Sequence, residues 1–221
     1  MIQYRIATII LLITLGVSGI YINYLNHKEP LIITKVKVVN KIVEVAPKGV
    51  LLSVVLADLQ KDLQSNYSFL SQNQRQEILN SIIKSSNEFN INPLVIYSLI
   101  SVESSMRWWV VSPTRTVMGS DKKKHKSNAK GLMSVIWSIH GKALVDNNII
   151  QKESELREIN GNIRAGSFIL SDMIKRYKGL NQGLRHYFGV SPYSKTYLRK
   201  IQRKIGSLVW FKMTPKVENI L

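Results

Sequence analysis

The hydrophobic and polar residues of this chain follow mainly the spacing of helices. In several stretches apolar residues recur every three or four positions, and glycine, proline or short polar runs separate these stretches. Such spacing is typical of amphipathic α-helices. The pattern predicts helices over residues 54–64, 71–88, 92–106, 131–141, 162–177, 183–189 and 194–209. Residues 112–128 are predicted to form a loop.

Residues 31–45 depart from this spacing. They are rich in Val and Ile and alternate in part with polar residues, which is typical of a strand or of an extended stalk. Pro47 and Gly49 then break the pattern. With this one segment set aside, residues 66–210 are predicted to form a mainly α domain, preceded by a linker over 31–65 and followed by a tail over 211–221.

The predicted helix over residues 92–106 carries a carboxyl group in an unusual place. Asn92 suits an N-cap and Pro93 suits the first helical position. Glu103 falls within the apolar arc of this helix, which is made by Ile96, Leu99, Ile100, Val102 and Met106. Burial of an unpaired carboxyl raises its pKa, as a general acid requires. The alternatives are a side chain that reaches solvent at the helix end, or one paired with Lys or Arg.

The N-terminal region predicts a membrane segment. Residues 6–25 are uncharged and mostly apolar, and about 20 such residues span a bilayer as a helix. We therefore expect residues 1–30 to be a single-pass anchor with the N-terminus inside and the following domain outside the cytoplasm. A cleavable signal peptide ending near Gly19 is the alternative. Either interpretation predicts export of the remaining chain.

Composition restricts the partners and the chemistry. The chain of 221 residues has a formal net charge of +17, which indicates an anionic partner: a cell-wall polymer, a phospholipid surface or nucleic acid. The absence of cysteine excludes disulfides and thiolate metal sites. The four histidines show no metal-ligand spacing, so neither a metal nor a cofactor is predicted.

The order of several short motifs resembles a known family. Glu103-Ser104 closes one helix, Ser112-Pro113 follows in a loop, and Gly131-Leu132-Met133 begins the next predicted helix. Asn162, with Gly166 after it, begins another, and Tyr187 and then Tyr197-Leu198 follow. Over about residues 71–205 the chain is similar to SLT-type lytic transglycosylase domains, which have a lysozyme-like fold and cleave peptidoglycan.

The resemblance implies a role for each matching residue. Glu103 would be the catalytic acid, and Ser104 and Ser112 would help to hold the substrate. The Gly131-Leu132-Met133 motif would line one wall of the cleft, Asn162 would open a cleft-facing helix, and Tyr187 would lie near the acid. Each also has a plainer interpretation, such as an N-cap for Asn162, packing or turn positions for Gly131 and Gly166, and a core position for Tyr187. Trp108 and Trp109 are predicted either to stack on sugars or to form a buried pair.

Three features depart from the family pattern. Ser134 stands where the family usually has Gln, so one contact to the sugar or peptide is in question. Phe188-Gly189-Val190 replaces the usual Asn and glycine-rich turn. The loop before Gly131 is long and basic over residues 115–128, as expected of a solvated loop or of a segment that meets anionic wall polymer.

The resemblance implies cleavage of the glycan strands of peptidoglycan without water. Glu103 would act as acid and then as base, and the product would end in a 1,6-anhydro sugar. The alternatives are a lysozyme-type hydrolase of the same bond, a non-catalytic wall-binding assembly protein, and a basic membrane-anchored nucleic-acid binder, although no nucleic-acid module is present. Local wall opening suits a bacteriophage virion or a secretion or conjugation machine, whose other components would be partners.

Overall fold

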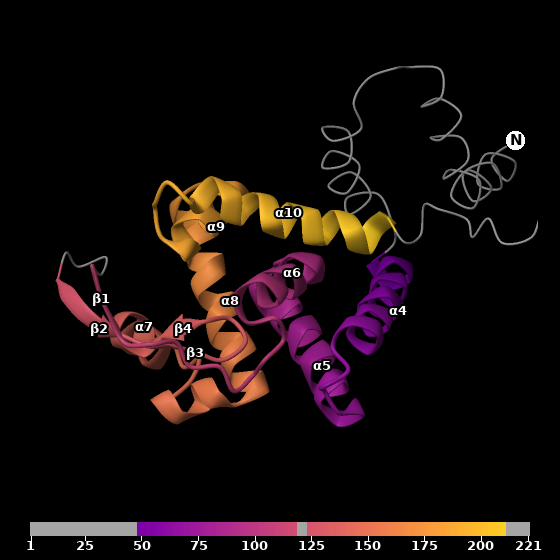
Figure 1. Cartoon of the computed structure of the whole chain (residues 1–221), viewed down its shortest axis with the longest axis horizontal. Coiled ribbons are helices and arrows are strands. Elements are labelled where there is room, and N and C mark those ends of the chain that lie inside the picture. The colour runs from indigo at the N-terminus through magenta and orange to yellow at the C-terminus, as the bar shows by residue number, and fades with distance from the viewer. Residues whose placement is uncertain (1–47, 119–122, 211–221) are drawn as a thin grey trace, which may run out of the picture. The chain divides into compact units, whose positions relative to one another are not determined.

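The computed structural model describes residues 48–118 and 123–210 (Figure 1). Residues 47–208 form one compact unit. A second unit, made of residues 1–46 and 209–221, lies almost entirely outside the described residues. The predicted anchor over 6–25, the predicted strand over 31–45 and the tail over 211–221 are therefore outside the part of the chain described here.

The compact unit is mainly helical, as the hydrophobic pattern predicts. It begins with three helices, α4 (Lys48–Asn66), α5 (Gln72–Phe89) and α6 (Pro93–Ser104). Four short strands follow: β1 (Arg115–Met118), β2 (Lys124–Ser127), β3 (Ala129–Lys130) and β4 (Val135–Ile136). The remainder consists of α7 (Trp137–Asp146), a 3₁₀ turn η1 (Glu153–Arg157), α8 (Ile159–Arg176), α9 (Leu180–Phe188) and α10 (Ser194–Trp210). Within residues 48–118 and 123–210 no helix is long and apolar enough to cross a membrane.

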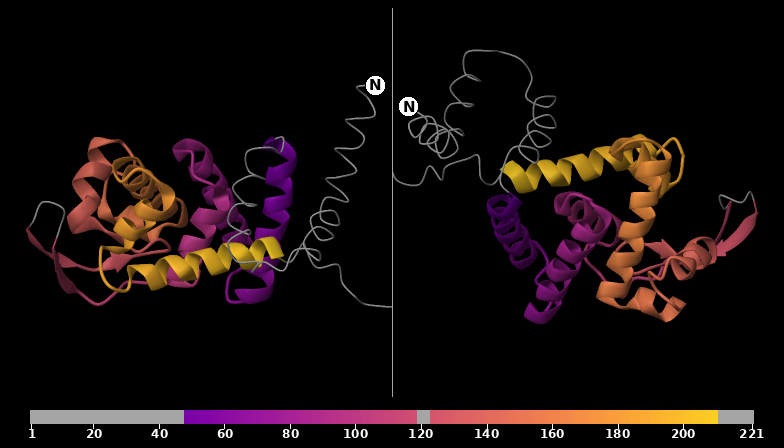
Figure 2. Two further views of the ribbon diagram at one scale, coloured as in Figure 1. Left: turned by 90° about the horizontal axis from the view of Figure 1, so that it is seen from above. Right: turned by 180° about the vertical axis from the view of Figure 1, so that it is seen from behind.

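Helix α6 lies at the centre of the core. Its residues from Leu94 to Ile100 are all buried, so the helix is covered around its whole circumference. Even Ser98, a polar residue outside the apolar arc, is 0% exposed. Helix α5 packs on α6 and α8, and α10 crosses over α6 with its C-terminal end near α4 (Figures 1 and 2).

Local sequence explains where α5 and α6 begin. Ser71 and Gln74 form a reciprocal capping box at the start of α5, as in the common N-terminal motif. Asn92 accepts a hydrogen bond from the Leu94 amide at 2.9 Å, and Pro93 follows in the first turn. The helix starts that the sequence predicts near residues 71 and 92 are confirmed.

One arginine joins three distant segments. The Arg164 guanidinium in α8 binds Glu88 at the end of α5, with a closest distance of 2.7 Å. It also donates to the carbonyls of Asn148 and Ile149, at 3.2 and 2.5 Å. A planar guanidinium suits such multiple contacts. It therefore fixes α8 against α5 and the segment after α7.

The predicted loop over residues 112–128 contains a hairpin instead. Strands β1 and β2 pair antiparallel, with Thr116 opposite Lys126 and Val117 opposite His125. Ser138 of α7 donates to the Lys126 carbonyl at 2.7 Å, which ties the hairpin to the helical body. The β-branched residues Thr116 and Val117 favour this extended structure. The hydrophobic pattern did not predict it, because the segment is rich in lysine.

Several helix boundaries also differ from the predictions. The helix predicted from residue 131 starts at Trp137, because Gly131 and Ser134 have positive φ angles of 71° and 52°, which a helix does not allow. Helix α8 begins at Ile159, three residues before the predicted start at Asn162. Helix α4 begins at Lys48 and belongs to the compact unit, so the unit extends N-terminal to the boundary predicted at residue 66.

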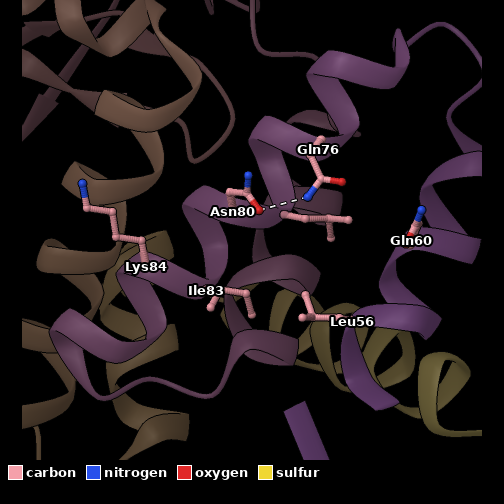
Figure 3. Close-up of a pocket in the computed structure, with 7 residues that line it drawn as sticks. Leu56, Gln60, Gln76, Asn80, Ile83 and Lys84 are labelled. Atoms are coloured by element: carbon pink, nitrogen blue, oxygen red, sulfur yellow. Dashed lines mark hydrogen bonds between the residues drawn. The ribbon is translucent and has the colours of Figure 1, made fainter. Parts of the chain in front are cut away.

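A shallow groove of about 320 Å³ lies between α4 and α5 (Figure 3). Its walls combine amide and apolar side chains, namely Leu56, Gln60, Gln76, Leu79, Asn80, Ile83 and Lys84. In the close-up, Gln76 donates to Asn80 along α5 at 3.0 Å. These residues come only from α4 and α5, so the groove is built from elements other than those that carry the acid site described next.

Candidate active site

Glu103 lies one residue before the last residue of α6 and is half-buried. The helix stops directly after it, because Ser105 and Met106 both have positive φ angles, of 51° and 63°. Ser104 is buried and donates to the Ile100 carbonyl at 3.1 Å. Arg107 then donates to the Ser104 carbonyl through its amide and its Nε. The helix end that carries the carboxyl group is thereby held in a defined turn.

A tyrosine from the C-terminal helix is the main partner of this carboxyl group. The Tyr197 hydroxyl in α10 donates a hydrogen bond to Oε1 of Glu103. Ser134 provides a second side-chain hydrogen bond to the same group. Phe188 stacks on the Tyr197 ring, with centroids 4.3 Å apart and planes inclined by 21°. The residues around Glu103 thus come from α9, α10 and the turn before β4.

Burial and hydrogen bonding act on Glu103 in opposite directions. Burial raises the pKa of the carboxyl group because it disfavours the charged form. The hydrogen bonds from Tyr197 and Ser134 lower the pKa, but burial has the larger effect and the pKa remains above its ordinary value. This direction agrees with the one predicted from the apolar arc. A carboxyl group with a raised pKa can carry a proton at a pH where an exposed one is ionised.

The two tyrosines near the acid remain protonated. Burial, together with the negative charge of Glu103, raises the pKa of Tyr197 and of Tyr187. Tyr187 donates from its hydroxyl to the Met133 carbonyl at 2.7 Å, and Tyr197 donates to Glu103. Each phenol is therefore a fixed donor, and the one on Tyr197 can stabilise Glu103 in its ionised form.

The Gly131-Leu132-Met133 motif forms a turn around the Asn162 side chain. The Asn162 amide donates to the carbonyls of Lys130 and Leu156, each at 2.8 Å, and its oxygen accepts from the Met133 amide at 2.8 Å. Gly131 has φ +71°, and a Cβ there would collide with Asn162. The buried amide of Asn162 therefore determines the shape of the turn that ends at Ser134.

Helix α8 approaches this turn closely at Gly166. A Cβ on Gly166 would lie 2.5 Å from the Cβ of Met133, so the position requires glycine. Leu132 and Met133 are both fully buried, and Asn162 is 1% exposed. These three side chains make contacts inside the protein, and their predicted role in binding the substrate stays a prediction.

Ser112 connects the segment after α6 to strand β3. Its hydroxyl accepts from the Ala129 amide at 2.8 Å, and its own amide donates to the Ala129 carbonyl at 2.9 Å. Next to this pair, Val111 and Lys130 form an antiparallel bridge, and Gly131 donates to the Val110 carbonyl at 2.8 Å. The chain from Glu103 to Ser112 is thus joined to the turn that carries Ser134.

Aromatic residues form a row along this same segment. Trp108 and Trp109 meet edge to face, Trp109 meets Phe69 in the same way, and Phe69 meets Tyr67. Trp109 is 51% exposed and Phe69 is 50% exposed. The alternatives from sequence were sugar-stacking rings or a buried pair. In the structure Trp108 is half-buried, whereas Trp109 presents much of its ring to solvent.

The next two acidic residues after Glu103 in the sequence are Asp121 and Asp146. Asp146 is paired with Lys142 at 2.6 Å on an exposed face of α7, and Asp121 lies outside the described residues. Within the described ranges, no group of three or more His, Asp or Glu side chains is placed to hold a metal ion.

Two residues of the site were given no functional role from sequence. In the sequence, Tyr197 is only part of the motif order, and Ser134 is a departure from the family that puts one contact in question. The structure places both on Glu103. A signal for Tyr197 was present, because Tyr197, Ile201 and Leu208 recur at helical spacing and are all buried. For Ser134 the sequence offered no comparable signal.

Comparison with known proteins identifies the family to which this chain belongs. The family model described as "Transglycosylase SLT domain" matches residues 80–204, which is more than half of the chain. The match begins within α5 and includes the Glu103 turn, the Gly131 motif, α8, α9 and most of α10. A search among curated proteins gave no match to this chain. The chain therefore belongs to the transglycosylase SLT family, whose activity is that of lytic transglycosylases on peptidoglycan.

Proposed function

We propose that this chain cleaves the β-1,4 bond between N-acetylmuramic acid and N-acetylglucosamine and that Glu103 is its catalytic acid and base. The observation that carries the proposal is the environment of Glu103. It is a carboxyl group whose pKa is raised by burial and whose ionised form has a fixed phenolic donor, Tyr197. A group that must both give and recover a proton needs both of its charge states to be supported.

The proposed reaction consumes no water. Glu103 gives its proton to the glycosidic oxygen while the bond from that oxygen to C1 of the muramic residue breaks. The resulting carboxylate accepts the hydrogen bond from Tyr197. It then removes the proton from the C6 hydroxyl of the same muramic residue, whose oxygen bonds to C1. The 1,6-anhydro ring closes, the proton is back on Glu103, and the enzyme can begin again.

An intramolecular nucleophile suits this site. The C6 hydroxyl is covalently tied to the ring that carries C1, which gives it a large effective concentration. A hydrolase instead needs a second carboxylate within about 5–9.5 Å of the acid. Asp146 is engaged with Lys142 on α7, which favours the non-hydrolytic reaction. Hydrolysis by a lysozyme-type mechanism with Asp121 as the second carboxylate is the competing proposal.

The substrate contacts predicted from the resemblance form part of this proposal. Ser104, Ser112 and Tyr187 lie on the segments that surround Glu103. Gly131, Leu132, Met133 and Asn162 form the turn that ends in Ser134. We propose that this turn shapes one wall of the glycan-binding cleft, with Asn162 acting through the backbone that it holds. The exposed ring of Trp109 offers a face on which a sugar can stack.

The proposed setting is local opening of the cell wall from a membrane. The apolar run over residues 6–25 would hold the chain at the membrane with the catalytic unit outside the cytoplasm. A bacteriophage virion or a secretion or conjugation machine would use such an enzyme to make a limited passage through the wall. The net charge of +17 suits a partner that carries negative charge.

Mass spectrometry of a peptidoglycan digest tests the reaction. We expect muropeptides ending in 1,6-anhydro-N-acetylmuramic acid, which are lighter than hydrolysed products by one water. Glu103→Gln should reduce the rate by at least about 10²-fold and leave the circular dichroism spectrum unchanged. Glu158→Gln, at an exposed position, is the matched control and should retain full activity.

Two outcomes would contradict parts of the proposal. Wild-type activity in Glu103→Gln would show that Glu103 is not the acid. Reducing-end products alone, together with an inactive Asp121→Asn variant, would show that the enzyme is a hydrolase.

A further inference from the structure

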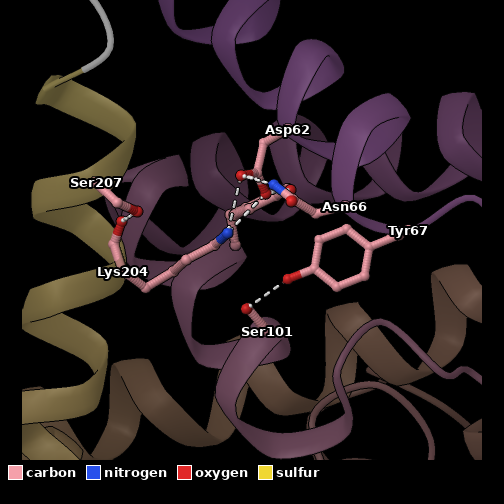
Figure 4. Close-up of polar contacts among 7 residues, drawn as sticks. Asp62, Asn66, Tyr67, Ser101, Lys204 and Ser207 are labelled. Atoms are coloured by element: carbon pink, nitrogen blue, oxygen red, sulfur yellow. Dashed lines mark hydrogen bonds and ion pairs between the residues drawn. The ribbon is translucent and has the colours of Figure 1, made fainter.

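A network around a largely buried ion pair joins α6 and α10, the helices that carry Glu103 and Tyr197, to a third helix, α4. Lys204 of α10 binds both carboxylate oxygens of Asp62 in α4, at 2.9 and 2.7 Å (Figure 4). The side chains are only 18% and 9% exposed. Asn66 donates to the same carboxylate at 2.8 Å. Asp62 and Asn66 lie N-terminal to residues 80–204, so the match to the family does not include them.

Asp62 is also bonded to the helix that carries Glu103. The Tyr97 hydroxyl of α6 donates to Oδ2 of Asp62, and Tyr97 is completely buried. The Lys204 ammonium lies over the rings of Tyr67 and Tyr97, 5.6 and 5.7 Å from their centroids, a distance at which cation–π attraction operates. The Tyr67 hydroxyl bonds Ser101 of α6 at 2.7 Å, as Figure 4 shows. This network therefore connects α4, α6 and α10.

The two catalytic contacts lie on the same two helices. Glu103 is six residues after Tyr97 on α6, and Tyr197 is seven residues before Lys204 on α10. A spacing of seven residues is close to two helical turns, so Tyr197 and Lys204 point to the same side of α10. One side of α10 is therefore attached to α6 at two levels: at the acid through Tyr197, and two turns away through Lys204 and Asp62.

An ion pair in this position is better explained by its effect on the relative positions of the helices than by a gain in the free energy of unfolding. Removing two charges from water is costly, and apolar residues of similar size often stabilise a protein equally well. A bidentate contact with a further hydrogen bond from Tyr97, however, allows few relative positions of the helices. Displacement of a catalytic group by about 1 Å can cost about 10²-fold in rate, so the separation of α6 and α10 affects catalysis directly.

We propose that Asp62 and Lys204 are positioning residues that hold α6 and α10 at the separation at which Tyr197 reaches Glu103. Helix α4 is then part of the catalytic apparatus, although it lies outside the matched family region. This inference rests on the proposed role of Glu103. In physical terms it predicts that loss of the Asp62 contact weakens the hydrogen bond from Tyr197 to Glu103 without touching either group.

The pH dependence of the full-length enzyme provides the test. Two titratable groups interact with Glu103 from the packed elements: Tyr197 of α10, whose hydrogen bond lowers the pKa of Glu103, and Tyr187 of α9, whose own pKa the charge of Glu103 raises. The Tyr197 bond lowers the pKa of Glu103, so weakening it raises that pKa. In Asp62→Asn we expect kcat to fall by about 10- to 10²-fold with little change in KM, and the alkaline limb of the kcat profile to move to higher pH. Tyr97→Phe, which preserves the buried ring, should move the limb in the same direction by less.

Two controls separate positioning from simple loss of folding. Asp146→Asn breaks an ion pair on an exposed face and should leave the pH profile unchanged. In a Tyr197→Phe background, Asp62→Asn should add almost no further shift, because the contact through which it acts is already gone. An unchanged alkaline limb in both Asp62→Asn and Tyr97→Phe, or fully additive effects with Tyr197→Phe, would overturn the proposal.

A measurement without turnover distinguishes this inference from the proposed function. The side-chain carboxyl of Glu103 can be followed by ¹³C NMR, with its resonance assigned by its disappearance in Glu103→Gln. Asp62→Asn and Tyr97→Phe should raise its titration midpoint even if the enzyme proves to act on another substrate. Unchanged midpoints would reject the positioning role. Shifted midpoints without any peptidoglycan cleavage would reject the proposed function alone.

Discussion

A single carboxyl group in this protein has an environment that serves both of its charge states. Burial favours protonated Glu103, whereas the donors Tyr197 and Ser134 favour the ionised form. Burial has the larger effect, so the pKa of Glu103 lies above its ordinary value, while the fixed donors stabilise the carboxylate form. Ser134 thus contributes to this balance, although it stands where the family usually has Gln.

The activity of the wild-type enzyme should therefore depend on pH through Glu103. The acid must be protonated at the start, so the rate should fall as pH rises through the pKa of Glu103. Tyr197→Phe removes a hydrogen bond that lowers this pKa, and the alkaline limb should move to higher pH. The value of kcat should fall as well, because the carboxylate loses its donor. Initial rates of peptidoglycan clearing over a range of pH values measure both effects.

The control for this prediction is a second tyrosine on the same segment. Tyr193 lies four residues before Tyr197 and is 74% exposed, so Tyr193→Phe should leave the limb in place. A shift of the alkaline limb to lower pH in Tyr197→Phe would mean that the phenol acts on Glu103 in some way other than as a donor to its carboxylate.

At the scale of secondary structure, sequence predicted those features that depend on neighbouring residues. The starts of α5 and α6 follow from caps that lie within three residues of the helix, at Ser71 and Asn92. The mainly α fold and the approximate positions of α9 and α10 follow from apolar spacing. The β1–β2 hairpin was missed, because its pairing is made by residues up to 12 apart in a lysine-rich segment.

The acid site could be predicted only in part for the same reason. Glu103 could be selected because its apolar neighbours Leu99 and Ile100 lie on its own helix. Its donor Tyr197 is 94 residues away in sequence, and no local pattern connects the two. The local pattern predicts only that Asn162 begins a helix, whereas its side-chain amide holds a turn about 30 residues earlier through long-range hydrogen bonds.

The turn around Asn162 leads to a prediction about stability. Asn162→Ala would leave the Met133 amide and the carbonyls of Lys130 and Leu156 without their partner. Each unsatisfied buried group costs about 1–3 kcal/mol. The free energy of unfolding of residues 47–208 should therefore fall by at least the cost of one such group. Urea denaturation monitored by circular dichroism measures the change.

Asn147 provides the matched control for this change. Its amide donates to the Ala143 carbonyl at 2.8 Å, but the residue is exposed. Water can replace the lost contact, so Asn147→Ala should alter the free energy of unfolding by no more than about 0.5 kcal/mol. Equal losses for the two variants would show that the Asn162 amide does not hold the turn.

At the scale of the whole molecule, we expect the N-terminal apolar run to hold the chain at a membrane and the compact unit to act on the cell wall. We expect full-length protein in the membrane fraction, with the catalytic unit accessible to protease added to spheroplasts, because residues 6–25 are long and apolar enough to span a bilayer. Fractionation followed by immunoblotting measures this. A variant that lacks residues 1–30 should be recovered in the supernatant.

Two results would reject the anchor. Full-length protein in the supernatant would show that residues 6–25 do not hold the chain at a membrane. A mature N-terminus at Ile20 would show that the segment is a cleaved signal peptide.

The long sequence separation of the acid from its donor has a consequence during protein synthesis. Glu103 and Tyr197 are 94 residues apart, and Asp62 and Lys204 are 142 apart. At about 5–20 residues per second, about 5–20 s pass between the synthesis of the acid and that of its donor. A nascent or prematurely terminated chain thus contains Glu103 but lacks the helix that completes its surroundings. Wall-cutting activity should appear only once translation has passed Tyr197 and Lys204.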